Sequence, residues 1–393
     1  MSLSLPKARA AAHDLGTGRR LGTERVPLAA AHGRTLAVGL VAAVSLPVVD
    51  CSAMDGWAVG STGAGPWRID GNVQMGALPG APITPDAARA ITTGGAVPPG
   101  AVSIVRLEHG VVEGGSLVLR EPSRQVRAGA DIRRSGEEAR RGERVASAGT
   151  RVSPAVVAAA AATGADELVV VRRPRVALVL IGDEVVEAGL PRPGQVRDTY
   201  GPVLPALLEG EGATVISRRR LRDDPDAVQE ALGVSDVDLV ISTGGTGASS
   251  ADHVTRALDA LRARNVARDV AIRPGHPTII AARADGVPVV ALPGNPFAAL
   301  AALVALGLPV FAGMVGAPPD RVVPRIASAP LEGRPRTTRL VTVSETASGV
   351  VAVDRQGSAM VSGMVGADAL ALVPASGAAA GETVGVLPLP WRR

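Results

Sequence analysis

Acidic residues and glycines at the ends of apolar runs are the features of this sequence best suited to chemistry. One such run ends in glycines and hydroxyls at Ser242-Thr243-Gly244-Gly245-Thr246-Gly247. Two others end in Leu292-Pro293-Gly294-Asn295-Pro296 and in Ile181-Gly182-Asp183-Glu184. Backbone N–H groups in such loops can approach an anion, and the N-terminus of a following helix adds partial positive charge. The loops therefore predict a phosphate site. Because they match neither a Walker A motif nor a dinucleotide fingerprint, a plain structural turn stays an open alternative.

Carboxylates that accompany these loops indicate a bound cation. They are Glu184, Asp223, Asp224 and Asp252. Hard cations such as Mg²⁺ take carboxylates together with the phosphates of a substrate, so Glu184, Asp223 and Asp252 are candidate metal ligands. Asp224, which precedes a proline, is also well explained as a helix N-cap, and Asp252 has the same alternative. The sequence holds no His/Cys cluster typical of zinc and no Gly-x-Ser-x-Gly elbow typical of a Ser-His-Asp triad.

A further loop, Arg273-Pro274-Gly275-His276-Pro277, could bring cationic donors to the same anion. The alternative for His276 is a loop histidine packed between prolines. Asp55 lies in a small, apolar stretch, Pro47 to Val59, and is followed by Gly56. Because Asp-Gly is a strong turn dipeptide, the spacing alone favours a turn over catalysis at Asp55.

Composition indicates a multidomain protein of a reducing compartment. The chain has 393 residues, a net charge of +4 and one cysteine, Cys51, so an internal disulfide is excluded and a cytoplasmic location is predicted. The basic stretch Arg124 to Arg144 interleaves arginines with acids and lacks aromatic residues, which favours a self-paired surface over nucleic-acid binding. We expect no run that approaches the roughly 20 apolar residues of a membrane helix, and hence no membrane contact.

The order of apolar runs predicts the elements that position these residues. Continuous β-branched runs alternate with helices between Arg175 and about Gly313, which is typical of a parallel sheet covered on both faces. Short runs broken by Gly and Pro predict a β-rich insert, a mostly helical stretch precedes it from Pro6 to about Leu46, and a small β-barrel closes the chain. The predicted domains are a helical linker and dimerisation domain at 1–46 and 151–172, the insert at 47–150, the α/β domain at 173–315 and the barrel at 316–393. In an open parallel sheet, ligands bind outside the carboxyl ends of the strands, where the three loops fall.

Taken together, these motifs resemble the molybdopterin molybdenumtransferase family, the MoeA type that includes the E domain of gephyrin. The resemblance covers nearly the whole chain and is carried, in order, by Ser52-Ala53-Met54-Asp55-Gly56, Thr93-Gly94-Gly95 with Pro98 and Glu108, Arg133-Arg134-Ser135-Gly136-Glu137-Glu138, Gly182-Asp183-Glu184, Asp198-Thr199, Arg222-Asp223-Asp224-Pro225, Gly244-Gly245 with Asp252, Arg273-Pro274-Gly275, Leu292-Pro293-Gly294-Asn295-Pro296 and Gln356-Gly357-Ser358. The fold it implies is an α/β sandwich of the molybdopterin-binding type.

The resemblance implies an activity and a site. The activity is insertion of molybdate into adenylylated molybdopterin, with release of AMP and assistance from Mg²⁺, in a homodimer whose site lies between the α/β domain of one subunit and the β-rich domain of the other. The implied catalytic acids are Asp55, Glu138, Glu184, Asp223 and Asp252. The expected substrate-binding residues are Thr93, Thr243, Gly244, Gly245, Thr246, Arg273, His276, Gly294, Asn295 and Ser358.

Some positions depart from the family pattern and leave other functions open. Glu138 replaces the usual Asp, Arg273 and His276 replace lysines, and Cys51 and Tyr200 stand where Asn is common. The rival enzyme is the molybdopterin adenylyltransferase, whose single domain resembles the region Arg175 to Gly313 and would leave Asp55 and the β-rich insert without a role. A non-catalytic scaffold that holds the pterin is the other alternative. Release of AMP, formation of the adenylylated pterin from ATP, or binding without turnover would separate these three.

Overall fold

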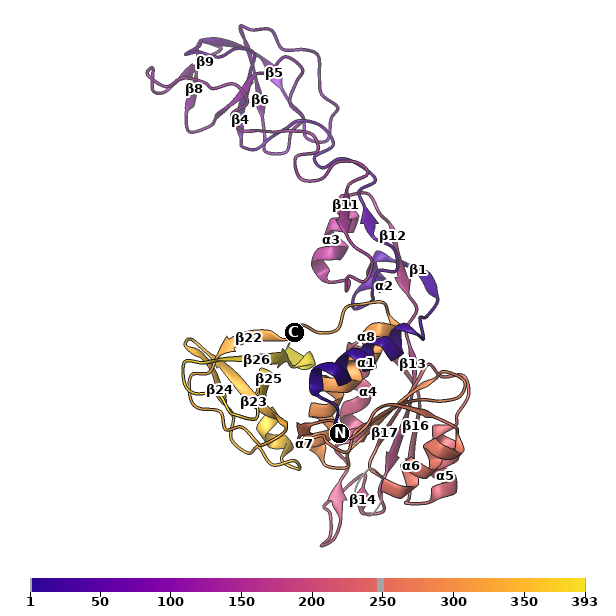
Figure 1. Cartoon of the computed structure of the whole chain (residues 1–393). Coiled ribbons are helices and arrows are strands. Elements are labelled where there is room, and N and C mark those ends of the chain that lie inside the picture. Colours follow the sequence, from indigo (N-terminus) through magenta and orange to yellow (C-terminus); the bar gives the residue numbers. More distant parts are fainter. Residues whose placement is uncertain (1, 246–250, 393) are drawn as a thin grey trace.

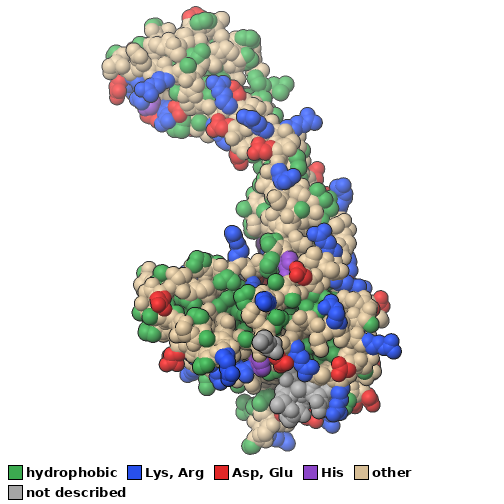
Figure 2. All heavy atoms as spheres, in the orientation of Figure 1, with side chains coloured by type: hydrophobic (Ala, Val, Ile, Leu, Met, Phe, Trp, Pro, Cys, Tyr) green, Lys and Arg blue, Asp and Glu red, His purple; other side chains and the backbone are tan. Residues whose placement is uncertain are grey.

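The structure is a computed structural model that describes residues 2–245 and 251–392, without the side chains of Ala251 and Asp252. The molecule is elongated (Figure 1). A β-rich module stands at one end, a linker follows, and the α/β sheet and a C-terminal barrel lie together at the other end. Figure 2 shows the linker as a narrow waist between these two ends. The domain limits expected from the sequence stay predictions.

The linker is built from two segments that are far apart in the sequence. Its strands are β1 (Thr23–Pro27), β2 (Leu40–Val41), β11 (Arg144–Ala146) and β12 (Glu167–Val171), and its helices are α2 (Leu28–Ala31) and α3 (Pro154–Ala162). β1 pairs antiparallel with β12, and β2 with β11. α3 begins as predicted, because the Ser153 side chain accepts a hydrogen bond from the N–H of Val156 and Pro154 fits the first turn.

The prediction of a mostly helical stretch up to Leu46 holds for two segments and is wrong for the rest. α1 (Leu5–Thr17) forms and packs against α8 (Leu308–Met314) of the α/β domain, and the Ala-rich α2 is a short helix, but residues 23–27 and 40–41 are strands. These strand segments contain no alanine. They form by pairing with β12 and β11, more than a hundred residues later in the chain.

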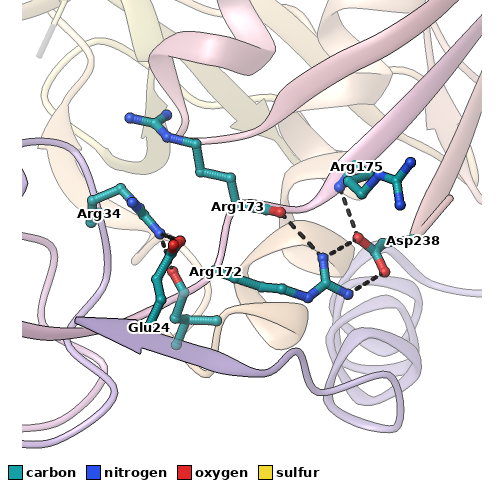
Figure 3. A network of polar contacts seen from close by, with 7 residues as sticks. Glu24, Arg34, Arg172, Arg173, Arg175 and Asp238 are labelled. Atoms are coloured by element: carbon teal, nitrogen blue, oxygen red, sulfur yellow. Dashed lines mark hydrogen bonds and ion pairs between the residues drawn. The ribbon is translucent and has the colours of Figure 1, made fainter. Parts of the chain in front are cut away.

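An ionic network fastens the linker to the α/β sheet (Figure 3). Asp238, which is 5% exposed, accepts two hydrogen bonds from the guanidinium of Arg172, at 2.6 and 2.7 Å, and one from the N–H of Arg175 at 2.8 Å. On the linker side, the buried Arg34 pairs with Glu24. Arg172 directly follows β12, so the network sets the direction in which the linker leaves the sheet.

We expect Asp238→Asn to destabilise the chain at pH 7 and to do so less in acid. Burial raises the pKa of Asp238, but the hydrogen bonds from Arg172 and Arg175 outweigh burial and leave the pKa below its usual value. The carboxylate therefore contributes stability above its unfolded pKa of about 3.9, and that contribution is lost as the pH falls through the folded pKa. The variant should lose about 1–3 kcal/mol at neutral pH.

Thermal unfolding at pH 7 and at decreasing pH below the unfolded pKa measures this difference. Asp86→Asn, at an exposed carboxylate of the β-rich module, is the control and should change little. A gap between wild type and Asp238→Asn that stays constant as the pH falls through both pKa values would contradict the role given to the ionised carboxylate.

The β-rich module contains the stretch around Asp55. Its strands are β3 (Cys51–Ser52), β4 (Gly56–Val59), β5 (Trp67–Asn72), β6 (Ala87–Ile91), β7 (Ser103–Arg106), β8 (Gly110–Glu113), β9 (Ser116–Leu119) and β10 (Ile132–Arg133). Six of them form one sheet in the order β7-β4-β6-β5-β9-β8, and β3 pairs with β10 beside it. Trp67 and Leu117 fill its core, and Cys51 is a buried free thiol.

The α/β domain is a mixed sheet with helices on both faces. Its strands are β13 (Arg175–Ile181), β16 (Thr214–Leu221), β17 (Leu239–Thr243), β18 (Arg264–Ala267), β20 (Ile279–Ala282) and β21 (Pro288–Leu292), in the order β16-β13-β17-β21-β20-β18. The predicted parallel pairing holds for β16, β13, β17 and β21. β20, however, pairs antiparallel with both of its neighbours, β21 and β18. A short parallel pair, β14 (Val185–Val186) with β15 (Val196–Arg197), extends from the end of β13.

Alternating side chains of β13 fill two separate cores. Leu178 and Leu180 pack on the side of α1, α4 (Tyr200–Gly210), α7 (Pro296–Ala302) and α8. Val179 and Ile181 pack on the side of α5 (Pro225–Leu232) and α6 (Ala251–Ala260). This arrangement explains why the strand is apolar throughout and does not alternate with polar residues.

The helical stretch Pro296–Met314 contradicts the expectation that no apolar run approaches the length of a membrane helix. It comprises α7, a π-helical turn η1 (Leu303–Gly307) and α8, 19 residues in all, and an 18-residue segment of it has a mean hydropathy of 2.2, which satisfies the length and composition of a membrane span. However, 94% of it is buried inside the protein. It is the central core helix of the α/β domain, packed between the sheet and α1.

The C-terminal domain is a small barrel. Its strands are β22 (Val323–Ile326), β23 (Thr338–Thr346), β24 (Gly349–Ala352), β25 (Ala369–Val373) and β26 (Thr383–Pro388), with short 3₁₀ turns η2 (Val361–Met364) and η3 (Pro390–Arg392). They pair in the order β24-β23-β25-β26-β22, and a bridge between Ala327 and Val350 closes the ring. One strand of the neighbouring domain, β19 (Ile272–Arg273), pairs in parallel with β23 and so joins the barrel to the α/β domain.

Candidate functional site

A cavity of about 720 Å³ opens at the carboxyl edge of the sheet, where the sequence predicts a ligand. The three predicted loops form its floor. They contribute Ile181, Gly182, Glu184, Thr243, Gly244, Gly245, Gly294, Asn295 and Pro296. Asp223, from the loop after β16, joins them, and the segment Val196 to Tyr200 closes another side. Thr246 lies outside the described residues.

Close backbone packing explains the glycine in the middle loop. Gly244 has φ +84°, and a Cβ atom there would lie 2.4 Å from the carbonyl oxygen of Ile181. The Gly244 N–H donates to the carbonyl of Leu292 at 3.2 Å. The loop after β17 is therefore wedged between the loops after β13 and β21, and a side chain at Gly244 would force them apart.

Glu184 and Asp223 are the carboxylates that the structure brings to this cavity. Within the described ranges, neither side chain is held in an ion pair or a hydrogen bond, although the N–H of Asp223 lies 3.4 Å from Asp183 Oδ1. Their donor chemistry fits a hard cation. No group of three His, Cys, Asp or Glu residues that could hold a metal exists within the described part of the chain. Any metal there would need further ligands, such as substrate phosphates or Asp252.

The other two acids near the loops differ in role. Asp224 is the N-cap of α5, since its side chain accepts hydrogen bonds from the N–H groups of Asp226 and Ala227, as predicted. α6 begins at Ala251, so Asp252 lies in its first turn and not at the N-cap position. The side chain of Asp252 lies outside the described residues.

A chain of polar contacts forms the opposite wall. Asp198 accepts hydrogen bonds from the N–H groups of Tyr200 and Gly201, at 2.9 and 3.0 Å, and pairs with Arg220. Arg220 also pairs with Glu187 at 2.9 Å. Burial raises the pKa of Asp198, but the Gly201 N–H and the Arg220 guanidinium outweigh it and keep that pKa below its usual value. Burial also raises the pKa of the Tyr200 phenol.

A second cavity, of about 570 Å³, lies between the α/β domain and the barrel. Arg273, Asn295 and Ser358 line it, as does Arg339. Arg273 and Arg339 are direct partners in the parallel pairing of β19 with β23. Arg339 also pairs with Glu332, another residue of the lining, at 3.8 Å. Among the described lining residues, the three arginines Arg273, Arg334 and Arg339 outnumber this one acid, so the cavity carries a net positive charge that suits an anion. Asn295 lines both cavities, and its Nδ2 donates to Ser358 Oγ at 3.3 Å.

His276, a predicted substrate-binding residue, lines neither of the two cavities. Its Nδ1 lies 2.8 Å from the carbonyl oxygen of Val270, and its Nε2 lies 3.8 Å from Asp269. The structural interpretation of this histidine fits these contacts better. Sequence reasoning missed Arg339, which lies on a strand with no motif around it, and Arg220, which lies two residues before the motif Arg222-Asp223-Asp224-Pro225 but is not part of it. Only the pairing of β19 with β23 reveals that Arg339 faces the Arg273 loop.

Asp55 and Thr93 form a hydrogen-bonded pair on the β-rich module. Asp55 Oδ1 accepts hydrogen bonds from the N–H of Thr93 at 2.6 Å and from its hydroxyl at 3.0 Å. These bonds hold the pKa of Asp55 below its usual range, so the exposed carboxylate is ionised at neutral pH. A Cβ atom at Gly56 would lie 2.0 Å from the carbonyl oxygen of Val105, which explains the glycine that follows.

Glu138 lies on the same module but is separately held. It pairs with Arg133 at 3.3 Å and lines a shallow cavity with Arg134 and Arg140. Neither Asp55, Thr93 nor Glu138 lines the two cavities of the α/β domain, and Figure 1 shows their module at the opposite end of the molecule. One chain alone therefore leaves the predicted acids in two groups, Asp55 with Glu138 and Glu184 with Asp223.

Comparisons with known proteins cover nearly the whole chain. The family models that match are the MoeA N-terminal region (domain I and II) over residues 3–164, a probable molybdopterin binding domain over 177–313, and the MoeA C-terminal region (domain IV) over 326–389. A solved structure, the molybdopterin biosynthesis moeA protein from Pyrococcus horikoshii OT3, shares the fold with a TM-score of 0.77, at 22% identity, covering 99% of this chain and 100% of that one.

Curated relatives are more similar in sequence. Molybdopterin molybdenumtransferase 2 of Mycobacterium tuberculosis is 35% identical over 294 residues, which are 70% of this chain and 71% of the relative. The molybdopterin molybdenumtransferase of Synechococcus elongatus is 34% identical over 292 residues, 70% of this chain and 72% of the relative. The fold, the family models and these identities show that the chain belongs to the molybdopterin molybdenumtransferase family of enzymes, the MoeA type, which acts in molybdenum cofactor biosynthesis.

Proposed function

We propose that this chain inserts molybdate into adenylylated molybdopterin and releases AMP. The observation that carries the proposal is the meeting of three backbone loops and two carboxylates, Glu184 and Asp223, in one cavity at the carboxyl edge of the sheet, where neither carboxylate has a partner among the described residues. Loops of this kind suit the phosphates of a substrate, and the carboxylates suit the cation that would accompany them.

Each of the two cavities would bind a different anionic group of the reactants. The N–H groups of Gly245, Gly294 and Asn295 would bind phosphate oxygens in the first cavity, since the Gly244 N–H already donates to Leu292. Arg273 and Arg339 supply positive charge in the second, which suits a phosphate or the molybdate oxyanion. Asn295, which lines both, would keep the two bound groups in register.

Glu184 and Asp223, with Asp252, are the residues that would hold Mg²⁺. The ion would neutralise the charge that develops on the phosphate oxygens as the phosphoanhydride bond to AMP is cleaved. Magnesium usually binds through one or two carboxylates together with substrate phosphates, which agrees with a carboxylate pair that forms no complete metal cage. No covalent intermediate on the protein is needed.

The proposal includes a homodimer in the cytoplasm, whose site is completed by a second copy. Asp55 with Thr93 is an ionised, exposed constellation that touches neither cavity of its own chain. An elongated chain with its β-rich module far from its α/β sheet can present that module to the cavity of a partner (Figure 1). Two copies related by a twofold axis would then share two equivalent sites.

Incubation of the purified chain with adenylylated molybdopterin, molybdate and Mg²⁺ tests the function. The expected result is stoichiometric release of AMP together with molybdenum cofactor, and loss of that release when the Mg²⁺ is chelated. Tight binding of the pterin without AMP would favour a scaffold. Formation of adenylylated pterin from molybdopterin and ATP would favour an adenylyltransferase.

A further inference from the structure

Tyr200, the one tyrosine of the chain, makes contacts that the proposed function does not use. It is the first residue of α4 and is 9% exposed. Its hydroxyl oxygen lies 2.7 Å from the carbonyl oxygen of Gly294 and 3.2 Å from that of Pro293. The hydroxyl therefore donates into the loop after β21 from the core side.

That loop is the junction between the two cavities. Asn295 lines both, and it reaches across to the barrel through its hydrogen bond to Ser358. Gly294 rests on the neighbouring loop, since a Cβ atom on Gly294 would lie 3.6 Å from the Cα of Gly244. A shift of the loop after β21 would therefore disturb both cavities together.

The backbone of Tyr200 is also held by a hydrogen bond. Its N–H is held by Asp198, which pairs with Arg220, and Arg220 pairs with Glu187 beyond β14. The tyrosine thus spans the first cavity's base, from the wall that contains Asp198 to the loop that contains Gly294. A phenylalanine would keep the ring in the core but could not hold the loop.

We propose that Tyr200 is a positioning residue that fixes the Pro293–Asn295 loop, so that the two cavities hold one extended anionic substrate in register. The inference rests on the proposed function. Without the hydroxyl, the carbonyls of Pro293 and Gly294 lose a buried donor, and the loop moves to regain hydrogen bonds. Displacement of about 1 Å in a positioning element is enough to weaken productive binding.

The first test compares Tyr200→Phe with a control that loses an equally buried hydroxyl. Thr163→Val is that control, because Thr163 is 2% exposed and its hydroxyl donates to the carbonyl of Ala159 at 2.6 Å in the linker. Both variants should lower the thermal midpoint to a similar extent. Only Tyr200→Phe should raise KM for adenylylated molybdopterin, by about tenfold, while kcat changes much less.

The possible results distinguish failure of the proposed function from failure of the role given to Tyr200. If the wild type releases no AMP, the proposed function fails. If the wild type releases AMP and Tyr200→Phe alters only the thermal midpoint, as Thr163→Val does, Tyr200 is merely structural and the inference is wrong.

A binding measurement on the full chain tests the inference without turnover. Because the chain has one tyrosine, 3-fluorotyrosine labelling gives a single ¹⁹F resonance at the loop. AMP with Mg²⁺, or molybdate alone, is added as the probe while calorimetry follows binding. The expected result is a shift of the resonance that follows the calorimetric saturation. An unmoved resonance at saturation, or no calorimetric binding of either probe, would overturn the proposal.

Discussion

Asp55→Asn is expected to reduce AMP release by about 100-fold or more without unfolding the β-rich module. The Asn oxygen can still accept the hydrogen bonds that Asp55 receives from Thr93, so the substitution removes the negative charge and little else. Since these bonds keep the pKa of Asp55 low, the wild-type carboxylate stays ionised from neutral pH well into acid. Loss of activity in the variant should therefore be similar at every pH above about 5.

Initial rates of AMP release, with circular dichroism as a check on folding, measure this effect. Asp86→Asn is the matched control, because Asp86 lies on the same module and accepts a hydrogen bond from the Thr84 hydroxyl at 2.7 Å. It should keep wild-type rates. If Asp55→Asn retained rates within a few-fold of the wild type, Asp55 would be the turn residue that its Asp-Gly sequence suggests.

Glu184→Gln is expected to have the other large effect, a fall in kcat of about 100-fold with a raised requirement for Mg²⁺. Glu184 and Asp223 are the two unpaired carboxylates of the cavity, so the amide removes half of the negative charge that the described residues offer to a cation there. The loop should be unaffected, because no hydrogen bond within the described residues depends on the Glu184 side chain.

Titration of activity with Mg²⁺ gives the readout for Glu184→Gln. Glu230→Gln is the control, since Glu230 is on α5 of the same domain and pairs with Arg219 at the surface, at 2.8 Å. An unchanged Mg²⁺ dependence in Glu184→Gln, even with a reduced rate, would remove Glu184 from the metal site.

The sequence predicts the sheet edge well because its signals are local. Apolar runs followed by Gly244 or Gly294 mark the ends of β17 and β21, and the structure brings both loops into one cavity with Glu184 and Asp223. Asp224 is equally local, since a carboxylate before a proline caps the helix that follows.

The features that could not be predicted from the sequence depend on contacts between segments that are distant in the chain. The linker strands form only by pairing across more than a hundred residues, so composition suggested helices in their place. Arg339 enters the second cavity through the pairing of β23 with β19. Tyr200 reaches Gly294 from a helix whose sequence carries no sign of that contact. In the proposed homodimer, the relation of Asp55 to the α/β cavity depends on a second copy of the chain.

Mixed dimers test that last relation most directly. Asp55→Asn and Glu184→Gln chains, carrying different tags, are co-expressed, and dimers that contain one of each are isolated by two affinity steps. If the module of one copy completes the cavity of the other, each mixed dimer has one site with both substitutions and one wild-type site, and about half of the wild-type AMP release returns although both parents are inactive. Mixed dimers as inactive as the parents would contradict a site shared between two copies.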